Sequence, residues 1–232
     1  MFRFIILIFS TLLLFSCAKE INVRTLTFEK NFKIAKEKFQ NKNYPRAIDD
    51  FNVILYNYSG ETFIDSVQYY LALSHFKNEE YYSASYEFAK LYENYPSSPL
   101  AEEALFKSAL SYYKLSPDVN LDQKETRAAF AKFQRFIEVF KEGEYSERAS
   151  EYIKELRNRF AEKEFKTAEL YMKLEQPRAA KVYYRSVMED YYDSDFFNEA
   201  IRGYAEASKM MKDMKTYNEY MKRYNSITKN VK

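Results

Sequence analysis

The stretch FKIAKEKF at residues 32–39 recurs as YYLALSHF at residues 69–76 and as FKSALSYY at residues 106–113. Each copy has an aromatic residue at both ends and an alanine in fourth position, and successive copies begin 37 residues apart. A fixed period between about 20 and 50 residues indicates a repeat protein, in which each unit buries its apolar face against the next. The period therefore predicts an extended binding surface rather than a catalytic pocket.

Each repeat is predicted to contain two helices. In the first repeat one helix is expected over residues 28–41 and a second from Tyr44 to about Tyr56, with Pro45 in its first turn. Only three Gly and five Pro occur in 232 residues, so few helix breakers are present, and no strand pattern with hairpin turns appears. The predicted fold is all-α, a superhelical solenoid of about five helix pairs. The expected N-caps include Asn43, Ser98, Ser146 and Ser194.

Small residues in both helices and an aromatic residue after the second resemble the tetratricopeptide repeat, whose usual period is about 34 residues. The longer period here implies longer helices or turns. The regular spacing is expected to end near Leu115, where an insertion over residues 116–121 is followed by longer spacings. Asp122 and Glu125 form a possible capping box, Ser146 opens a long helix to about Leu174, and Pro177 begins its partner.

The N-terminus has the features of a targeting segment. The apolar run at residues 4–15 is too short to span a bilayer, which takes about 20 residues, but it fits the core of a signal peptide. The sequence LFSC at residues 14–17 resembles a bacterial lipobox, and Cys17 is the only cysteine. We therefore expect a lipoprotein signal peptide over residues 1–16, acylation of Cys17, and a lipidated tether over residues 17–27. The alternative is an incidental cysteine within an ordinary signal peptide.

Charge is unevenly distributed although the net charge is only +2. Residues 17–43 carry seven Lys or Arg against three Asp or Glu, and residues 209–232 carry seven against two. These ends are either solvated surface or docking sites for acidic partners or lipid head groups. Neither end has the aromatic interleaving of a nucleic-acid patch, so no nucleic-acid partner is expected.

The chemistry of a catalytic or metal site is not found in this sequence. His75 is the only histidine, so the usual zinc sites cannot form, and it is expected to be a packed side chain. The three glycines at positions 60, 143 and 203 form no phosphate-binding loop. We therefore predict no enzymatic activity, no cofactor and no metal.

One family resemblance covers roughly residues 28–207. The segment YPSSPLAEEALF at residues 95–106, LSYY at 110–113 and AELY at 168–171 are similar to segments of the BamD family of outer-membrane assembly lipoproteins. The Asp-Gln-x-x-Thr insertion at residues 122–126 is its most specific part. The sequence departs from the family at Lys141 and Tyr183, where Pro and Arg are common.

The resemblance implies a function as well as a fold. It implies a lipid-anchored protein on the periplasmic face of the outer membrane that scaffolds the assembly of β-barrel proteins. Its partners would be a BamA-like β-barrel protein, other assembly lipoproteins, and the C-terminal segments of unfolded outer-membrane proteins. The alternative is another periplasmic tetratricopeptide lipoprotein, which serves in cell-envelope division or secretion.

Residues that recur at the repeat period form columns along the first helices, and these columns are the candidate peptide groove. Aromatic rings with ammonium groups beside them suit an extended peptide with aromatic side chains and a terminal carboxylate. Packing between helices is the alternative explanation. We expect the groove in a regular part, residues 28–118, and partner docking in an irregular part, residues 119–232. The groove candidates are Phe32, Phe39, Tyr69, Phe76, Lys77, Phe106, Tyr113 and Lys114, with Tyr69, Phe106, Lys77 and Lys114 preferred if only one column binds.

Overall fold

A computed structural model describes residues 27–229, which form ten α-helices and no strand. The prediction of an all-α solenoid is confirmed. The signal peptide, Cys17 and nearly all of the tether lie outside the described residues. The helices are α2 (Phe28–Gln40), α3 (Tyr44–Asn57), α4 (Ile64–Lys77), α5 (Tyr81–Asn94), α6 (Ala101–Leu115), α7 (Lys124–Val139), α8 (Ser146–Lys173), α9 (Pro177–Asp190), α10 (Phe197–Met210) and α11 (Met214–Lys229).

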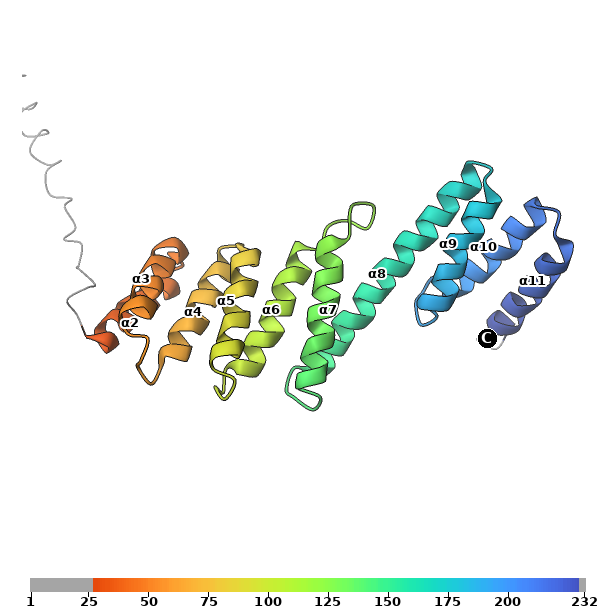
Figure 1. Cartoon of the computed structure of the whole chain (residues 1–232). Coiled ribbons are helices and arrows are strands. Elements are labelled where there is room, and N and C mark those ends of the chain that lie inside the picture. The colour runs from red at the N-terminus through yellow and green to blue at the C-terminus, as the bar shows by residue number, and fades with distance from the viewer. Residues whose placement is uncertain (1–26, 230–232) are drawn as a thin grey trace, which may run out of the picture.

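The ten described helices stand as five antiparallel pairs in a row (Figure 1). Each helix packs on the helices before and after it in the chain. In addition α2 contacts α4, and α8 contacts α10. The first helices of the pairs, α2, α4, α6, α8 and α10, therefore share one face of the solenoid, which we call the first-helix face.

The recurring alanines lie where helices approach each other most closely. Ala35, Ala72 and Ala109 in the first helices are fully buried, and so are Ala47 and Ala84 in the second helices. Side chains larger than a methyl group would force these helices apart, because protein interiors are packed as densely as organic crystals. Alanine thus recurs every 37 residues because each copy occupies a contact between two helices.

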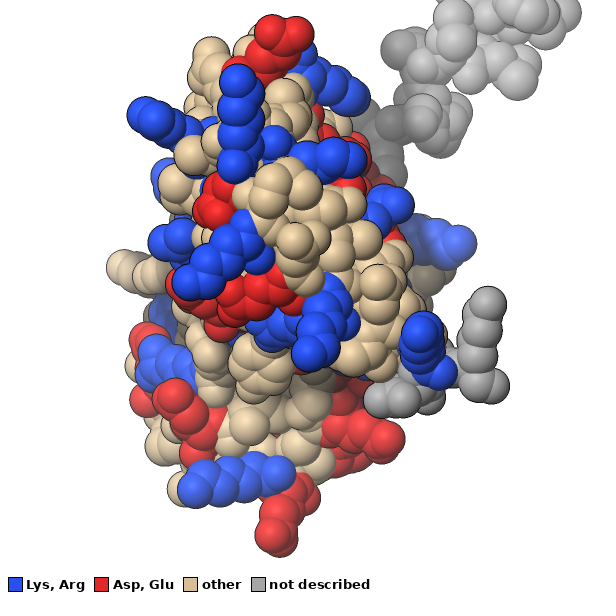
Figure 2. Space-filling view, turned by 90° about the vertical axis from the view of Figure 1, so that its right-hand side faces the viewer, with Lys and Arg blue, Asp and Glu red and all other residues tan. Residues whose placement is uncertain are grey.

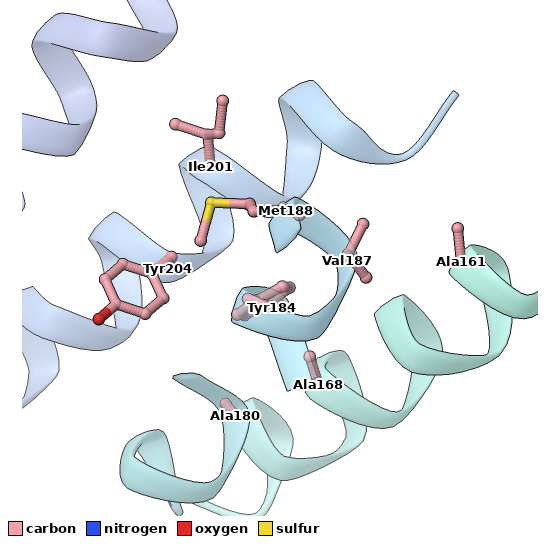
Figure 3. Packing of buried hydrophobic residues seen from close by; sticks show 9 residues of the cluster. Ala161, Ala168, Ala180, Tyr184, Val187, Met188, Ile201 and Tyr204 are labelled. Atoms are coloured by element: carbon pink, nitrogen blue, oxygen red, sulfur yellow. The ribbon is translucent and has the colours of Figure 1, made fainter. Parts of the chain in front are cut away.

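The aromatic residues of the second helices fill the space between units. Phe51 and Phe88 are fully buried, and their counterpart in α9, Tyr184, is 4% exposed. In the C-terminal pairs α9 lies between α8, which presents Ala161 and Ala168, and α10, which presents Ile201 (Figure 3). Each core cluster therefore contains residues from two neighbouring helix pairs and is not confined to one pair.

The turn inside four of the five pairs is built on a residue in the left-handed conformation. Lys42, Glu79, Glu175 and Lys212 have φ values of 60°, 62°, 56° and 63°. After each of them, the next N–H donates to the carbonyl five residues earlier, as in Asn43 to Lys38 and Asp213 to Ser208. This is the Schellman motif, in which glycine is the usual left-handed residue.

The same turns correct one prediction about the period. Glu175 and Lys212 are 37 residues apart, and so are Lys42 and Glu79. The 37-residue spacing therefore returns in the C-terminal half, where longer spacings were expected. The division of the chain at residue 118 stays a prediction, but the interval between the last two of these turns equals that between the first two.

Two insertions separate the regular halves. The C-cap residues that follow α3, α5, α7 and α9 are Tyr58, Tyr95, Phe140 and Tyr191, at intervals of 37, 45 and 51. The first excess of eight residues forms the loop between α6 and α7, and the second of fourteen lengthens α8. At 28 residues α8 is about 42 Å long, and the other first helices have only 13–15 residues. The expected long helix from Ser146 and the start of α9 at Pro177 are confirmed.

Most of the predicted side-chain caps are wrong. Asn43 precedes α3, but its side chain makes no capping hydrogen bond. Ser98 lies three residues before α6, and Ser194 three residues before α10, where its Oγ has no hydrogen-bond partner. Backbone bonds close the turns at Asn43 and Ser194, for example from the N–H of Phe197 to the carbonyl of Ser194. The Oγ of Ser98 does accept a hydrogen bond from the N–H of Leu100, in the turn before α6. Ser146 is itself the first residue of α8, and its Oγ donates to the carbonyl of Phe140.

The left-handed turns lead to a stability prediction. Glu79→Gly is expected to raise the free energy of unfolding by about 1 kcal/mol, because a residue with a Cβ is strained at φ 62° and glycine is not. Asn78→Gly is the matched control, since Asn78 has φ −88° and gains nothing from glycine. Urea unfolding followed by circular dichroism at 222 nm checks both variants. A loss of stability in Glu79→Gly equal to that in Asn78→Gly would contradict the prediction.

Candidate functional site

The predicted groove columns lie mostly inside the interfaces between helices. Phe106 is 1% exposed, and its ring contacts Phe133 and Phe136 of α7. Phe39 packs on Tyr70, and Phe76 packs on Phe88. Phe106 is therefore a core residue, and Phe39 and Phe76 are half-buried within the same packing.

Two tyrosines of the predicted groove connect neighbouring first helices. Tyr69 of α4 lies beside Glu103 of α6, and its burial, followed by the interaction with this carboxylate, raises its pKa well above the usual value. The hydroxyl of Tyr113 in α6 donates to Glu155 of α8 at 2.5 Å. Burial and this bond raise the pKa of Tyr113 to about 12. Both tyrosines thus interact with a glutamate on the first helix of the next unit.

Lys77 and Lys114 remain on the surface. Both are exposed, at the C-terminal ends of α4 and α6, and neither takes part in an ion pair within residues 27–229. A lysine at a helix C-terminus also interacts favourably with the helix dipole. Both lysines are accessible to a ligand. The aromatic rings that were predicted to bind the same peptide are more buried than the lysines are.

One predicted residue, Phe32, does line a surface groove, which lies along α2 and reaches the loop before α4. We call it the α2 groove. Its volume is about 430 Å³, and Phe28 and Phe63 contribute apolar surface to it. Phe63 is 64% exposed. The remaining lining residues are Glu29, Lys33, Lys36, Glu37 and Gln40.

Lys36 is held over the aromatic rings at this groove. Its Nζ lies 5.5 Å from the ring centroid of Phe32 and 4.9 Å from that of Tyr70. Cation–π contacts of this kind orient an ammonium group without neutralising it. The α2 groove therefore combines an apolar floor with a positioned positive charge. Since α2 is the first described helix, no earlier helix within residues 27–229 covers it.

The sequence columns pointed to Phe32 but missed most of this site. Lys36 belongs to the first repeat copy, yet its counterparts Leu73 and Leu110 are not cationic, and Lys33 recurs only in the third copy, as Lys107, so a search for recurring residues gives little signal for either. Phe63 lies in a loop, outside the columns. The basic composition of residues 17–43 was the one signal that could have directed attention to α2.

The described residues offer no cluster of metal-binding side chains. Among residues 27–229 no three His, Cys, Asp or Glu side chains are placed to hold a metal ion. The Nδ1 of His75 lies 2.6 Å from a carboxylate oxygen of Glu80, across the turn from α4 to α5. The histidine thus has a structural contact at the turn.

The C-terminal end of the molecule does not form a uniform basic surface. Within residues 209–229 there are six Lys or Arg against two acidic residues. Seen from this end, however, the basic side chains are interleaved with acidic and uncharged ones (Figure 2). Within residues 27–229, no helix is both long and apolar enough to cross a membrane.

Comparisons with known proteins match one family model and several solved structures. The sequence profile of a family described as YfiO, outer membrane lipoprotein, matches residues 25–223. No curated protein sequence matches the chain. The TPR2AB-domain:pHSP90-complex of yeast Sti1 is 12% identical, with a TM-score of 0.49 over 85% of this chain and 76% of that one. A tetratricopeptide repeat protein from Parabacteroides merdae is 13% identical, with a TM-score of 0.42 over 91% and 80%.

Proposed function

The chain belongs to the YfiO family of outer membrane lipoproteins, and from this premise we propose that it is a non-enzymatic component of the machinery that assembles β-barrel proteins in the outer membrane. It is anchored through acylated Cys17 on the periplasmic face. It scaffolds a BamA-like β-barrel protein and other assembly lipoproteins, and it binds the C-terminal segments of unfolded outer-membrane proteins. The solenoid form supports a binding role, because stacked helix pairs present extended surfaces.

The α2 groove is the observation that supports substrate binding most directly. Phe28, Phe32 and Phe63 offer apolar surface to an aromatic side chain, at a low cost in side-chain entropy. Lys33 and Lys36 stand beside them and can meet a terminal carboxylate. Barrel segments that end in an aromatic residue have both features. We therefore place the peptide site at α2 and treat Lys77 and Lys114 as an extension of it along the first-helix face.

A titration with a labelled peptide tests this assignment. The probe is a peptide of about ten residues that ends in phenylalanine with a free carboxylate, and fluorescence anisotropy measures its affinity. Lys36→Gln is expected to weaken binding about five- to tenfold, since a charged hydrogen bond contributes about 1–1.5 kcal/mol at a partly exposed site. The same peptide with an amidated C-terminus is expected to bind the unaltered protein with a similar loss.

Lys30→Gln is the matched control, because Lys30 is exposed on the same helix but does not line the groove. Its affinity for the peptide should equal that of the unaltered protein. Equal affinities of the carboxylate and amide peptides would contradict the site at α2. The variant Lys77→Gln measures whether the site extends to α4.

The scaffolding role has a separate test. Affinity isolation of the lipidated protein from solubilised envelopes, followed by mass spectrometry, is expected to recover a large β-barrel protein with periplasmic repeats. Recovery of peptidoglycan enzymes in its place would favour a lipoprotein of envelope division. Recovery of neither class would contradict both scaffold functions.

A further inference from the structure

A second groove lies on the first-helix face at the other end of the solenoid, between α8 and α10. We call it the α8–α10 groove. Its volume is about 430 Å³, and Phe165, Met172 and Tyr184 supply its apolar lining. These three residues come from α8 and α9, and the opposite wall is α10 with Gly203.

Gly203 shapes this wall. It lies inside α10, where glycine costs about 1 kcal/mol relative to alanine. A Cβ at this position would overlap the ring of Tyr184. The absent side chain lets the ring of Tyr184 in α9 pack directly against α10. The cost of a helical glycine is thus offset by close packing at the groove.

The rim of the groove carries three acidic and two basic side chains, so acidic groups are in slight excess. Glu169, Glu199 and Glu206 line it together with Arg202 and Lys173. Arg202 is paired with Glu199 at 2.5 Å, and Glu199 also accepts a hydrogen bond from Tyr224. No ion pair between described residues involves Glu169 or Glu206. The proximity of Glu169 adds to the effect of burial in raising the pKa of Tyr184 to about 12.

We propose that the α8–α10 groove binds a protein segment in which an apolar side chain is flanked by Lys or Arg. The apolar side chain enters between Phe165 and Met172, and the cations meet Glu169 and Glu206 on the rim. The expected charge preference is opposite to that proposed for the α2 groove, whose lining holds Lys33 and Lys36 beside Glu29 and Glu37. The two ends of the first-helix face therefore take different partners. This site does not depend on the proposed substrate site.

Two peptides of about 12 residues, used with the full-length lipidated protein in detergent, test the inference. Both are amidated and fluorescently labelled and have a central Leu-Phe pair, flanked by Lys and Arg in one and by Glu in the other. The basic peptide is expected to bind about tenfold more tightly than the acidic one, and more weakly as salt is raised. Glu169→Gln with Glu206→Gln is expected to weaken basic-peptide binding about tenfold.

Controls separate the groove from general charge effects. Glu138→Gln removes an exposed carboxylate of α7 outside the groove and is expected to leave the affinity unchanged. Lys36→Gln, which tests the α2 groove, is likewise expected to leave basic-peptide binding unchanged. Glu169→Lys with Glu206→Lys is expected to reverse the preference toward the acidic peptide, with the helical circular dichroism signal retained.

Several results would overturn the inference. Equal affinity for the two peptides, or an unchanged affinity in the Glu→Gln double variant, excludes recognition by these carboxylates. If a peptide with Ser-Ser in place of Leu-Phe keeps the same affinity, the apolar lining of the groove does not contribute to binding. Loss of binding in Glu138→Gln equal to that in the double variant would show a nonspecific charge effect.

Discussion

Phe106→Ala is expected to lower the free energy of unfolding by about 3–5 kcal/mol, the range for removal of a buried phenylalanine. The ring is 1% exposed and lies 4.9 Å from the ring centroid of Tyr145 and 6.1 Å from that of Tyr152. It also contacts Phe133 and Phe136 of α7. The substitution leaves a cavity where α6, α7 and α8 meet, so it weakens the junction between the two regular halves.

Urea unfolding followed by circular dichroism measures this change. Tyr86→Ala is the control, because Tyr86 is 64% exposed and its loss is expected to cost at most about 0.5 kcal/mol. In folded Phe106→Ala the carboxylate peptide should bind as tightly as in the unaltered protein. Lost peptide affinity with unchanged stability would instead make Phe106 a ligand contact.

Gly203→Ala is expected to lower the free energy of unfolding by about 2 kcal/mol. The added methyl group would overlap the ring of Tyr184, which is 4% exposed and cannot turn into solvent. Overpacking of this kind costs about 1–3 kcal/mol and outweighs the better helix propensity of alanine. The substitution is also expected to narrow the α8–α10 groove.

Gly60→Ala is the matched control, since a Cβ at Gly60 would have nothing within 4 Å. A second variant tests the cause: Gly203→Ala with Tyr184→Leu should be less destabilised than the sum of the two single changes. Additive losses would mean that Tyr184 is not the obstructing group. Thermal unfolding of all four variants provides the comparison.

The architecture could be predicted from the repeat period because the recurring residues lie at contacts between helices. Alanines recur where helices touch, and the structure buries Ala35, Ala72 and Ala109 completely. Helix ends were less predictable. Side-chain caps were expected at Asn43 and Ser194, but backbone hydrogen bonds close those turns. The left-handed residues were not foreseen, because Lys42 and Glu79 are not glycines and carry no composition signal.

The candidate site, too, could be predicted from the sequence only in part. Aromatic residues at the repeat period mark positions on the first helices, but they do not say whether a ring faces a groove or a neighbouring helix. Phe32 and Phe106 occupy equivalent positions, yet one lines the α2 groove and the other is enclosed by α7 and α8. The difference arises because α2 is the first described helix and α6 lies in the middle of the row.

By itself the sequence determined the class of fold, the five helix pairs, the long helix from Ser146 and the family resemblance, because each depends on local pattern and spacing. Only the tertiary structure decided which aromatic rings are accessible, that Gly203 packs against Tyr184 at a second groove, and that the 37-residue period returns after α8. These properties depend on which helix covers which face. Coverage is set by residues distant in the sequence, so the pattern of a single repeat does not contain it.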